Sequence, residues 1–253
     1  MCIIAIKPKG RAMFKNSEIR TMFQNNPDGA GLCYAENGRV IIEKGFMTVN
    51  SLLHYLGEKN FYHHNVILHF RIGTSGKKDA LNCHPFPVYS KNAVKTSCDM
   101  ALAHNGVFRD YTPPLMSKEN DTQVFLKQVV STLDPSFVKD DDKMFLLGEL
   151  AGSSRLALMD KDGEYYLVGD FIESNGYLYS NWSFNPFKGY YAFKNLLDFE
   201  DEKEELKEMF EDSEALERRL DSLTCIDEGY YYDDDFYYTV DENHLTLYKE
   251  KAS

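Results

Sequence analysis

Apolar and polar positions along the chain predict many short strands interrupted by two groups of helices. A continuous apolar run over residues 2–6 predicts a buried strand near the start of the chain. Two strands at 31–36 and 39–44 flank Asn37-Gly38, the strongest short signal for a hairpin. Further strands are predicted over residues 65–72, 99–104, 156–159, 165–168, 177–179 and 190–193.

Four helices are predicted before residue 198, over residues 17–24, 48–58, 121–131 and 142–150. Ser17 is the expected cap of the first helix, and Asn120 and Gln123 stand at capping-box spacing at the start of the third. Short strands combined with two groups of helices favour an α+β layered domain.

The character of the chain changes near residue 197, and we predict a domain over 2–197 followed by an acidic, Tyr-rich appendage over 198–253. The appendage carries 20 acidic and 6 basic residues, whereas the first 197 residues carry 20 acidic and 22 basic residues. A charged helix is predicted over 199–223, and a strand pair over 236–240 and 244–248. Because the main body offers no broad basic surface, nucleic acid is not an expected partner.

Length and cysteine usage exclude several classes of protein. No apolar run approaches the roughly 20 residues that span a bilayer, and the run at 2–6 is too short for a signal-peptide core. The five cysteines are odd in number, scattered and without a C-x-x-C pair, which argues against a disulfide framework and a cysteine zinc site. A reducing cytoplasm is therefore the expected location, and no membrane partner is expected.

The residue with the clearest chemical potential is Cys2. Removal of Met1 is expected because the aminopeptidases that take it accept a small second side chain. The thiol, with a pKa of about 8.5, would then lie beside its own α-amine, with a pKa of roughly 7.7–8.0. The amine can take the thiol proton without a distant histidine. The alternative is that Cys2 is a small apolar residue starting a buried strand.

If Cys2 attacks an amide, the site needs donors for an oxyanion and partners for a charged substrate. Asn105-Gly106 offers a side-chain amide and a flexible backbone N–H. Arg71 ends an apolar strand and carries the planar fork that binds a carboxylate, and Asp121 at a helix start could receive an ammonium group. Each alone also has a simpler interpretation: a turn, a surface charge and a helix cap.

Taken in order, several motifs resemble the class II glutamine amidotransferases over about residues 2–190. The motifs are Met1-Cys2, Pro27-Asp28-Gly29-Ala30-Gly31, His69-Phe70-Arg71-Ile72-Gly73-Thr74-Ser75-Gly76, Asn82-Cys83-His84-Pro85-Phe86, Ala103-His104-Asn105-Gly106 and Asn120-Asp121-Thr122. The resemblance implies the N-terminal-nucleophile hydrolase fold, a four-layer αββα sandwich of two mainly antiparallel sheets.

The resemblance also implies roles for individual residues. Cys2 would be the nucleophile, Asn105 and the Gly106 N–H the oxyanion hole, and Arg71 and Asp121 the partners of the glutamine α-carboxylate and α-ammonium. The remaining residues would surround the substrate: Thr74, Ser75 and His84 in or near a loop closing over glutamine, and Gly29 close to Cys2. No metal and no cofactor is implied.

Three functions remain open at this point. The first is a stand-alone glutaminase, which forms a Cys2 thioester and supplies ammonia to a separate acceptor synthase. The second is a hydrolase of another γ-glutamyl amide. The third is a non-catalytic binder whose acidic tail engages a basic protein or mimics nucleic acid; negative tails are, however, often simply solvated.

Overall fold

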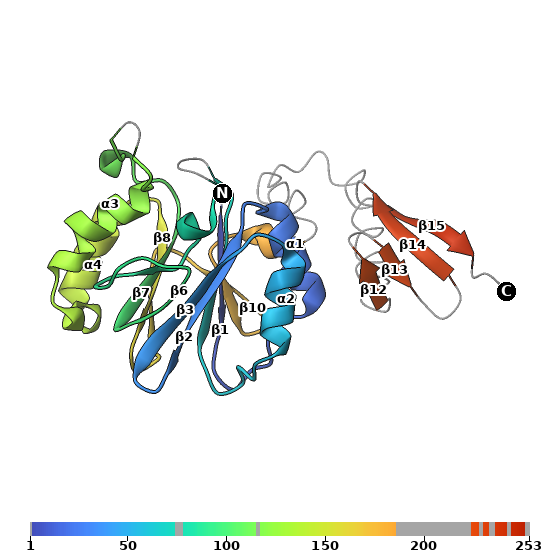
Figure 1. Cartoon of the computed structure of the whole chain (residues 1–253), viewed down its shortest axis with the longest axis horizontal. Coiled ribbons are helices and arrows are strands. Elements are labelled where there is room, and N and C mark those ends of the chain that lie inside the picture. Colours follow the sequence, from blue (N-terminus) through green and yellow to red (C-terminus); the bar gives the residue numbers. More distant parts are fainter. Residues whose placement is uncertain are drawn as a thin grey trace, which may run out of the picture. The chain divides into compact units, whose positions relative to one another are not determined.

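The computed structural model describes residues 2–73, 78–114 and 117–185 and, beyond these, only the strands between residues 224 and 250 (Figure 1). The chain divides into two compact units, Met1–Asn185 and Pro186–Ser253. The boundary predicted at 197/198, the predicted helix 199–223 and the predicted strand 190–193 all lie outside the described residues.

The first unit contains two antiparallel sheets. The larger has seven strands in the order β10 (Ile172–Ser174), β11 (Tyr177–Tyr179), β1 (Ile3–Lys7), β4 (Val66–Phe70), β2 (Ala30–Glu36), β3 (Arg39–Phe46) and β6 (Lys95–Cys98). The smaller has four strands in the order β5 (Phe86–Pro87), β7 (Met100–Asn105), β8 (Arg155–Asp160) and β9 (Tyr165–Val168). The described helices are α1 (Asn16–Asn25), α2 (Val49–Gly57), α3 (Asp121–Gln128) and α4 (Asp141–Ala151), and the 3₁₀ turns are η1 (Ala80–Asn82), η2 (Arg109–Tyr111), η3 (Val130–Thr132), η4 (Pro135–Lys139) and η5 (Trp182–Phe184).

The layering follows from the alternation of side chains along each strand. On β1, Ile3 and Ala5 pack in a cluster with residues of α1 and α2, whereas Ile4 and Ile6 pack in a second cluster against the other sheet. A third cluster joins the outer face of the smaller sheet to α3 and α4. Three apolar layers therefore hold four structural layers together, with helices on both outer faces (Figure 1). The predicted α+β sandwich is confirmed.

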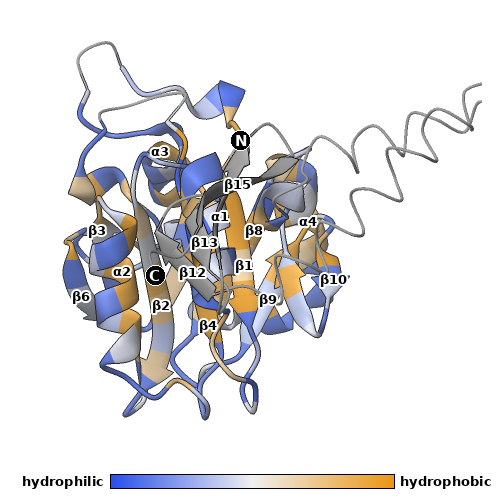
Figure 2. Cartoon of the chain, turned by 90° about the vertical axis from the view of Figure 1, so that its right-hand side faces the viewer, coloured by the Kyte–Doolittle hydropathy of each residue, from blue (hydrophilic) through white to orange (hydrophobic). Residues whose placement is uncertain are grey.

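The central apolar layer explains why the sheets pack closely. The smaller sheet contributes Ala101, Ala103 and Ala157 to it, and these short side chains leave room for the branched side chains of Ile4 and Ile42. Burying one such side chain fully stabilises the fold by roughly 1.5–3 kcal/mol. Figure 2 shows the hydropathy that this layering needs: β1, buried on both faces, is hydrophobic along its length, whereas α2, with one face outside, alternates between hydrophobic and hydrophilic residues.

Several local predictions are confirmed and one is wrong. The hairpin at Asn37-Gly38 forms, with φ angles of 52° and 72° that Asn and Gly tolerate best. The first helix, however, begins at Asn16 and is capped at Lys15 rather than at Ser17. The reason is Glu18, whose carboxylate accepts a hydrogen bond from the Lys15 N–H at 2.8 Å. This contact gives the backbone N–H at the helix start an acceptor, so the helix begins before Ser17.

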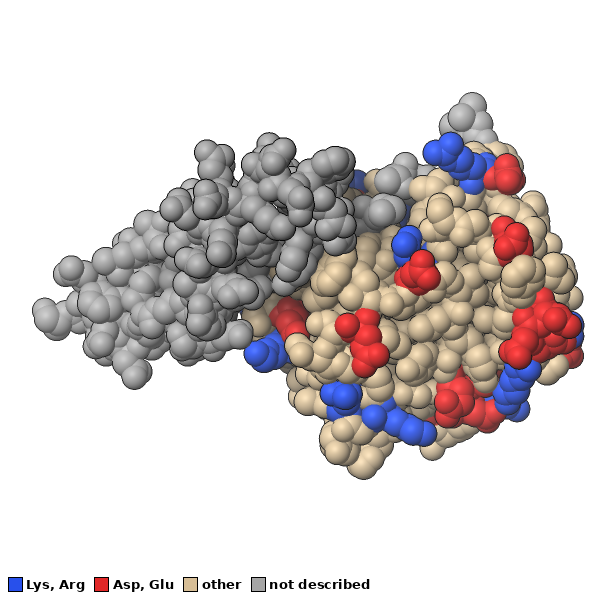
Figure 3. Space-filling model, turned by 180° about the vertical axis from the view of Figure 1, so that it is seen from behind, with Lys and Arg blue, Asp and Glu red and all other residues tan. Residues whose placement is uncertain are grey.

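The surface of the first unit is mixed in charge. On the face shown in Figure 3, Lys and Arg lie beside Asp and Glu, and they form no continuous basic patch there. Among the described residues, no helix is long and apolar enough to cross a membrane.

The second unit contains an antiparallel sheet in the order β12 (Thr224–Asp227), β13 (Tyr230–Tyr232), β14 (Phe236–Asp241) and β15 (His244–Glu250). The predicted pair at 236–240 and 244–248 is confirmed, because Asp241 lies opposite His244 in the β14–β15 register. Strands β12 and β13 were not predicted. The three consecutive tyrosines of β13 have high β-propensity but no apolar–polar alternation that would have revealed the strand.

Candidate active site

The register of β1 and β4 brings Cys2 and Arg71 together at one end of these two neighbouring strands. Ile3 lies opposite Phe70, so the residue before β1 and the residue after β4 emerge side by side. The Cys2 thiol lies within reach of the Ile72 backbone, 3.4 Å from its nitrogen and 3.5 Å from its oxygen. Two residues far apart in sequence are therefore positioned by strand pairing alone.

The second sheet and α3 complete a cleft around the Cys2 thiol. Gly106 follows the end of β7, and Asp121 is the first residue of α3. The cleft is lined by Cys2, Arg71, Ile72, Gly73, His84, His104, Gly106, Asn120, Asp121 and Thr122. Five of the residues singled out from the sequence, Cys2, Arg71, His84, Gly106 and Asp121, therefore share one cleft.

Cys2 differs in exposure from Cys33, Cys83 and Cys98. Its side chain is partly exposed, whereas Cys33, Cys83 and Cys98 are buried. Burial of its sulfur raises the pKa of Cys2, and the Ile72 backbone N–H only partly opposes that shift. The group is therefore mostly a neutral thiol at pH 7, and it needs a general base to become a nucleophile.

The Pro27–Gly31 turn fixes the backbone around Arg71. The Asp28 N–H donates to the Arg71 carbonyl at 2.9 Å, and the Arg71 N–H donates to the Gly29 carbonyl at 2.8 Å. The Asp28 carboxylate accepts the Gly73 N–H at 2.7 Å and pairs with Lys78 at 2.7 Å. Although burial alone would raise the pKa of Asp28, these two partners lower it, so the carboxylate is charged at neutral pH.

Asp121 presents a partly satisfied carboxylate to the cleft. One oxygen accepts the Phe108 N–H at 2.8 Å and the other accepts the Thr122 N–H at 2.9 Å. An ionised carboxylate has about four lone-pair sites, so two remain beyond these contacts with the described part of the chain. The group can therefore receive a substrate ammonium without losing its backbone contacts.

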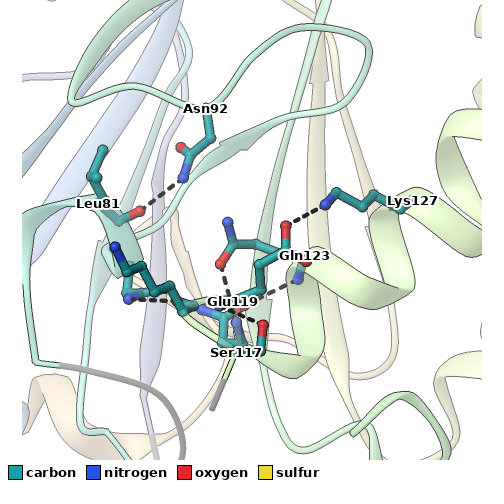
Figure 4. A network of polar contacts seen from close by, with 9 residues as sticks. Leu81, Asn92, Ser117, Glu119, Gln123 and Lys127 are labelled. Carbon is teal, nitrogen blue, oxygen red and sulfur yellow. Dashed lines mark hydrogen bonds and ion pairs between the residues drawn. The ribbon is translucent and has the colours of Figure 1, made fainter. Parts of the chain in front are cut away.

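The start of α3 is held by a polar network (Figure 4). The predicted capping box is confirmed: Asn120 accepts the Gln123 N–H at 3.0 Å, and Gln123 accepts the Asn120 N–H at 3.1 Å. Asn82 in η1 donates to the Lys118 carbonyl at 3.4 Å, which connects the loop after β4 to the segment before α3. This network fixes the position of the neighbouring Asp121.

Gly106 lies where no other residue fits. Its φ of +155° is unfavourable for residues with a side chain, and a Cβ would lie 2.2 Å from Ser154 Oγ and 2.9 Å from His104 Nε2. The backbone at this point can therefore lie against the cleft wall only as glycine.

Three buried histidines connect the two sheets, and two of them, His84 and His104, line the cleft. His69 Nε2 lies 3.0 Å from the His104 carbonyl, and His84 Nδ1 accepts the His104 N–H at 3.2 Å. Burial lowers the pKa of His69 and of His104 to about 3, and it lowers that of His84 well below the ordinary value. All are neutral at pH 7, and none is placed as a cationic partner for a carboxylate.

Other residues singled out from the sequence lie elsewhere. A Cβ on Gly29 would lie 2.6 Å from Cys83 Sγ, and Gly29 does not line the cleft. Asn105 is 1% exposed and does not line the cleft either. Thr74 and Ser75 lie outside the described residues. Among the residues that are described, no group of three or more His, Cys, Asp or Glu side chains could hold a metal ion.

Ser180 and Asn181, just after β11, were missed by sequence reasoning. Ser180 Oγ accepts the Ile4 N–H at 2.8 Å and lies 2.9 Å from Asn105 Nδ2. Asn181 Nδ2 donates to the Cys2 carbonyl at 2.7 Å. All three contacts join residues more than 70 positions apart, and no local pattern in the sequence signals them.

Comparison with known proteins adds a likeness of fold. No family model and no curated protein matches the sequence. One similar solved structure is the glutamine phosphoribosylpyrophosphate amidotransferase from B. subtilis complexed with ADP and GMP, at 18% identity and a TM-score of 0.49. Another, described as the allosteric regulatory enzyme of purine biosynthesis, has 19% identity and a TM-score of 0.46. Each comparison covers 71% of this chain and 41% of the other, so the chain spans well under half of their length.

Proposed function

We propose that the chain is a glutamine amidotransferase of class II, which hydrolyses the side-chain amide of glutamine through Cys2. The observation that carries the proposal is the shared cleft, in which a thiol, a guanidinium and a carboxylate surround one space. Arg71 would bind the α-carboxylate and Asp121 the α-ammonium, so that the amide carbon lies near the Cys2 sulfur.

The proposed reaction needs Met1 to be removed. The freed α-amine of Cys2 takes the thiol proton, and the sulfur attacks the amide carbon of glutamine. The Gly106 N–H, together with the Asn105 amide, stabilises the oxyanion. When the tetrahedral intermediate collapses, the amine gives its proton to the leaving nitrogen, and ammonia departs. Water then attacks the thioester and releases glutamate, which restores the thiol and the amine.

The central experiment follows glutamate and ammonia release from glutamine by the full chain. Intact mass first verifies that Met1 has been removed. We expect turnover by the wild type and none by Cys2→Ala, which keeps a small second residue and is processed in the same way. Protein that lacks Met1 and releases no ammonia from glutamine would contradict the proposal, and γ-glutamyl compounds would then be assayed as alternative substrates.

Labelling provides a second line of evidence. A diazoketone analogue of norleucine should add one equivalent to Cys2, and excess glutamine should slow the addition. Iodoacetamide is a second reagent for the same thiol. It should modify Cys2, which is partly exposed, in preference to the buried Cys33, Cys83 and Cys98, and bound glutamine should slow this reaction too because it covers the sulfur. Adducts on Cys33, Cys83 or Cys98 in the folded protein would argue against this site.

Substrate recognition can be tested separately from chemistry. Arg71→Lys keeps the charge but loses the two-pronged geometry, so the KM for glutamine should rise at least about tenfold. The loss should be much smaller for a glutamine α-ester, which lacks the carboxylate.

We further propose that the ammonia passes to a separate acceptor enzyme. Affinity capture with and without residues 198–253, followed by an ammonia-transfer assay, tests this proposal.

A further inference from the structure

The hydrogen bonds around Asn105 leave two groups without partners. As placed, the Asn105 Nδ2 donates to Ser180 Oγ at 2.9 Å, and the Asn105 Oδ1 is buried with no partner among the described residues. Ser180 Oγ also accepts the Ile4 N–H at 2.8 Å, so both of its acceptor sites are used and its own hydrogen has no acceptor there.

Rotating the Asn105 amide by 180° exchanges its oxygen and nitrogen and gives a partner both to the amide oxygen and to the Ser180 hydroxyl hydrogen. The set of heavy-atom positions stays the same. Ser180 then donates its hydrogen to Asn105 Oδ1 at the same 2.9 Å while still accepting from Ile4. The amide nitrogen takes the position that now has no protein partner. Its two N–H donors then have no partner among the described residues, and an unpaired buried donor is costly unless a group accepts from it. Under the proposed function that acceptor is the oxyanion.

We propose that Ser180 is a positioning residue, which holds the Asn105 amide with its nitrogen directed away from the Ser180 side and available to the oxyanion. This inference rests on the proposed function and adds to it the group that orients one oxyanion donor. The Ile4 N–H occupies one acceptor site of the serine hydroxyl, and the hydroxyl hydrogen, donated to Asn105 Oδ1, orients the amide. Because Ile4 lies in β1 two residues after Cys2, the same strand positions the Cys2 nucleophile and, through Ser180, the Asn105 amide.

The first test concerns orientation and does not depend on activity. In the full chain labelled with ¹⁵N-asparagine, the Asn105 side-chain amide is assigned by its disappearance in Asn105→Ala. We expect no nuclear Overhauser contact between its NH₂ protons and the Ser180 β-protons or the Ile4 N–H. Strong contacts to these protons would show that the nitrogen faces Ser180, and they would overturn the inference even if glutamine is hydrolysed.

The second test measures catalysis. Ser180→Ala should lower kcat for glutamine about 10- to 100-fold with little change in KM, because an oxyanion donor acts mainly in the transition state. Ser180→Thr retains the hydroxyl and should recover much of the rate. The matched control is Ser183→Ala, which removes a buried hydroxyl that has no partner among the described residues and should leave kcat unchanged.

A double-mutant cycle separates positioning from general support of the fold. If Ser180 acts through Asn105, then Ser180→Ala should change kcat less than twofold in an Asn105→Ala background. An equal loss in both backgrounds would overturn the inference, since Ser180 would then act only on β1. Inactivity of the wild type would instead refute the proposed function, and the orientation test would still decide the placement of the amide.

Discussion

At Gly106, backbone conformation and contact with two side chains, Ser154 and His104, together exclude any other residue. The backbone φ is +155°, and the space that a Cβ would fill is taken by Ser154, whose Oγ and Cβ lie 2.2 Å and 2.7 Å from that point. Gly152 provides a comparison, because its φ is +57° but no atom lies within 4 Å of its missing Cβ. The two positions separate conformational strain from steric overlap.

We therefore expect Gly106→Ala to lower the free energy of unfolding by about 2–4 kcal/mol, and Gly152→Ala by about 1–2 kcal/mol. In a Ser154→Gly background the two shortest contacts are removed and the contact of 2.9 Å with His104 Nε2 remains, so the cost of Gly106→Ala should fall part of the way toward that of Gly152→Ala. Urea unfolding monitored by circular dichroism measures the wild type, the three single variants and the Gly106→Ala/Ser154→Gly double variant. Equal costs in the two backgrounds would contradict this account of the position.

The family resemblance identified the candidate site residues from residue type and order along the chain. The structure explains why five of them, Cys2, Arg71, His84, Gly106 and Asp121, share one cleft. Cys2 and Arg71 meet because of the β1–β4 register, and Gly106 and Asp121 because the end of β7 and the start of α3 face the same cleft. Ser180 could not be found in this way. Its partners, Ile4 and Asn105, lie 176 and 75 positions away, and only the completed sheet brings them together.

Among the secondary-structure elements, α3 combines a local signal with a role in the site. Its capping box was readable from the sequence because Asn120 and Gln123 interact within one turn.

Strands β6 and β10 were not predicted. They lie at the two ends of the larger sheet, and they are strands because their neighbours provide pairing partners rather than because of their own composition.

The cap of α3 is open to a direct test. Asn120→Ala should lower the free energy of unfolding by about 1 kcal/mol, because the Gln123 N–H loses its acceptor. Asn120→Ser retains a good cap and should stay within about 0.5 kcal/mol of the wild type. Because Asp121 follows directly, Asn120→Ala should also raise the KM for glutamine more than Asn120→Ser does. The reverse order in either measurement would count against the cap.

The histidines between the two sheets should make stability depend on pH. The folded-state pKa is about 3 for His69 and His104 and is also strongly lowered for His84, whereas an unfolded histidine titrates near 6.5. The unfolded chain therefore binds protons that the folded chain does not. Their stabilising effect is complete above pH 6.5 and is lost progressively as the pH falls toward 3.

Between pH 7 and pH 5.5, His69 and His104 should each cost roughly 1.3 kcal/mol of stability, and His84 should add a loss in the same direction. His69→Gln retains a donor toward the His104 carbonyl, and it should remove roughly 1.3 kcal/mol of the pH dependence. Urea titrations at pH 7.0, 6.2 and 5.5 measure it. This range lies above the ordinary titration of carboxylates, so the lowered pKa of Asp28 does not contribute to the slope. An unchanged slope in His69→Gln would contradict the assignment.

For the whole molecule, the three apolar clusters and the cleft all belong to residues before Pro186. Residues 1–185 contain 20 acidic and 20 basic side chains, whereas residues 186–253 contain 20 acidic and only 8 basic ones. The net charge of −12 is therefore carried entirely by the second unit. The unit that holds the cleft is electrically neutral overall, and the acidic unit dominates the behaviour of the chain in solution.

A chain ending at Asn185 should therefore fold and unfold cooperatively, because 185 residues with their own apolar clusters exceed the size that a stable domain needs. It should show the α+β circular dichroism spectrum and, under the proposed function, release ammonia from glutamine at a rate close to that of the full chain. It should also fail to bind an anion exchanger at pH 7, and it should precipitate at lower concentration than the full chain, since a net charge near zero favours association. Binding of the truncated chain to the exchanger as tightly as the full chain would contradict the charge partition. A truncated chain without a cooperative unfolding transition would mean that the first unit depends on the second for its stability.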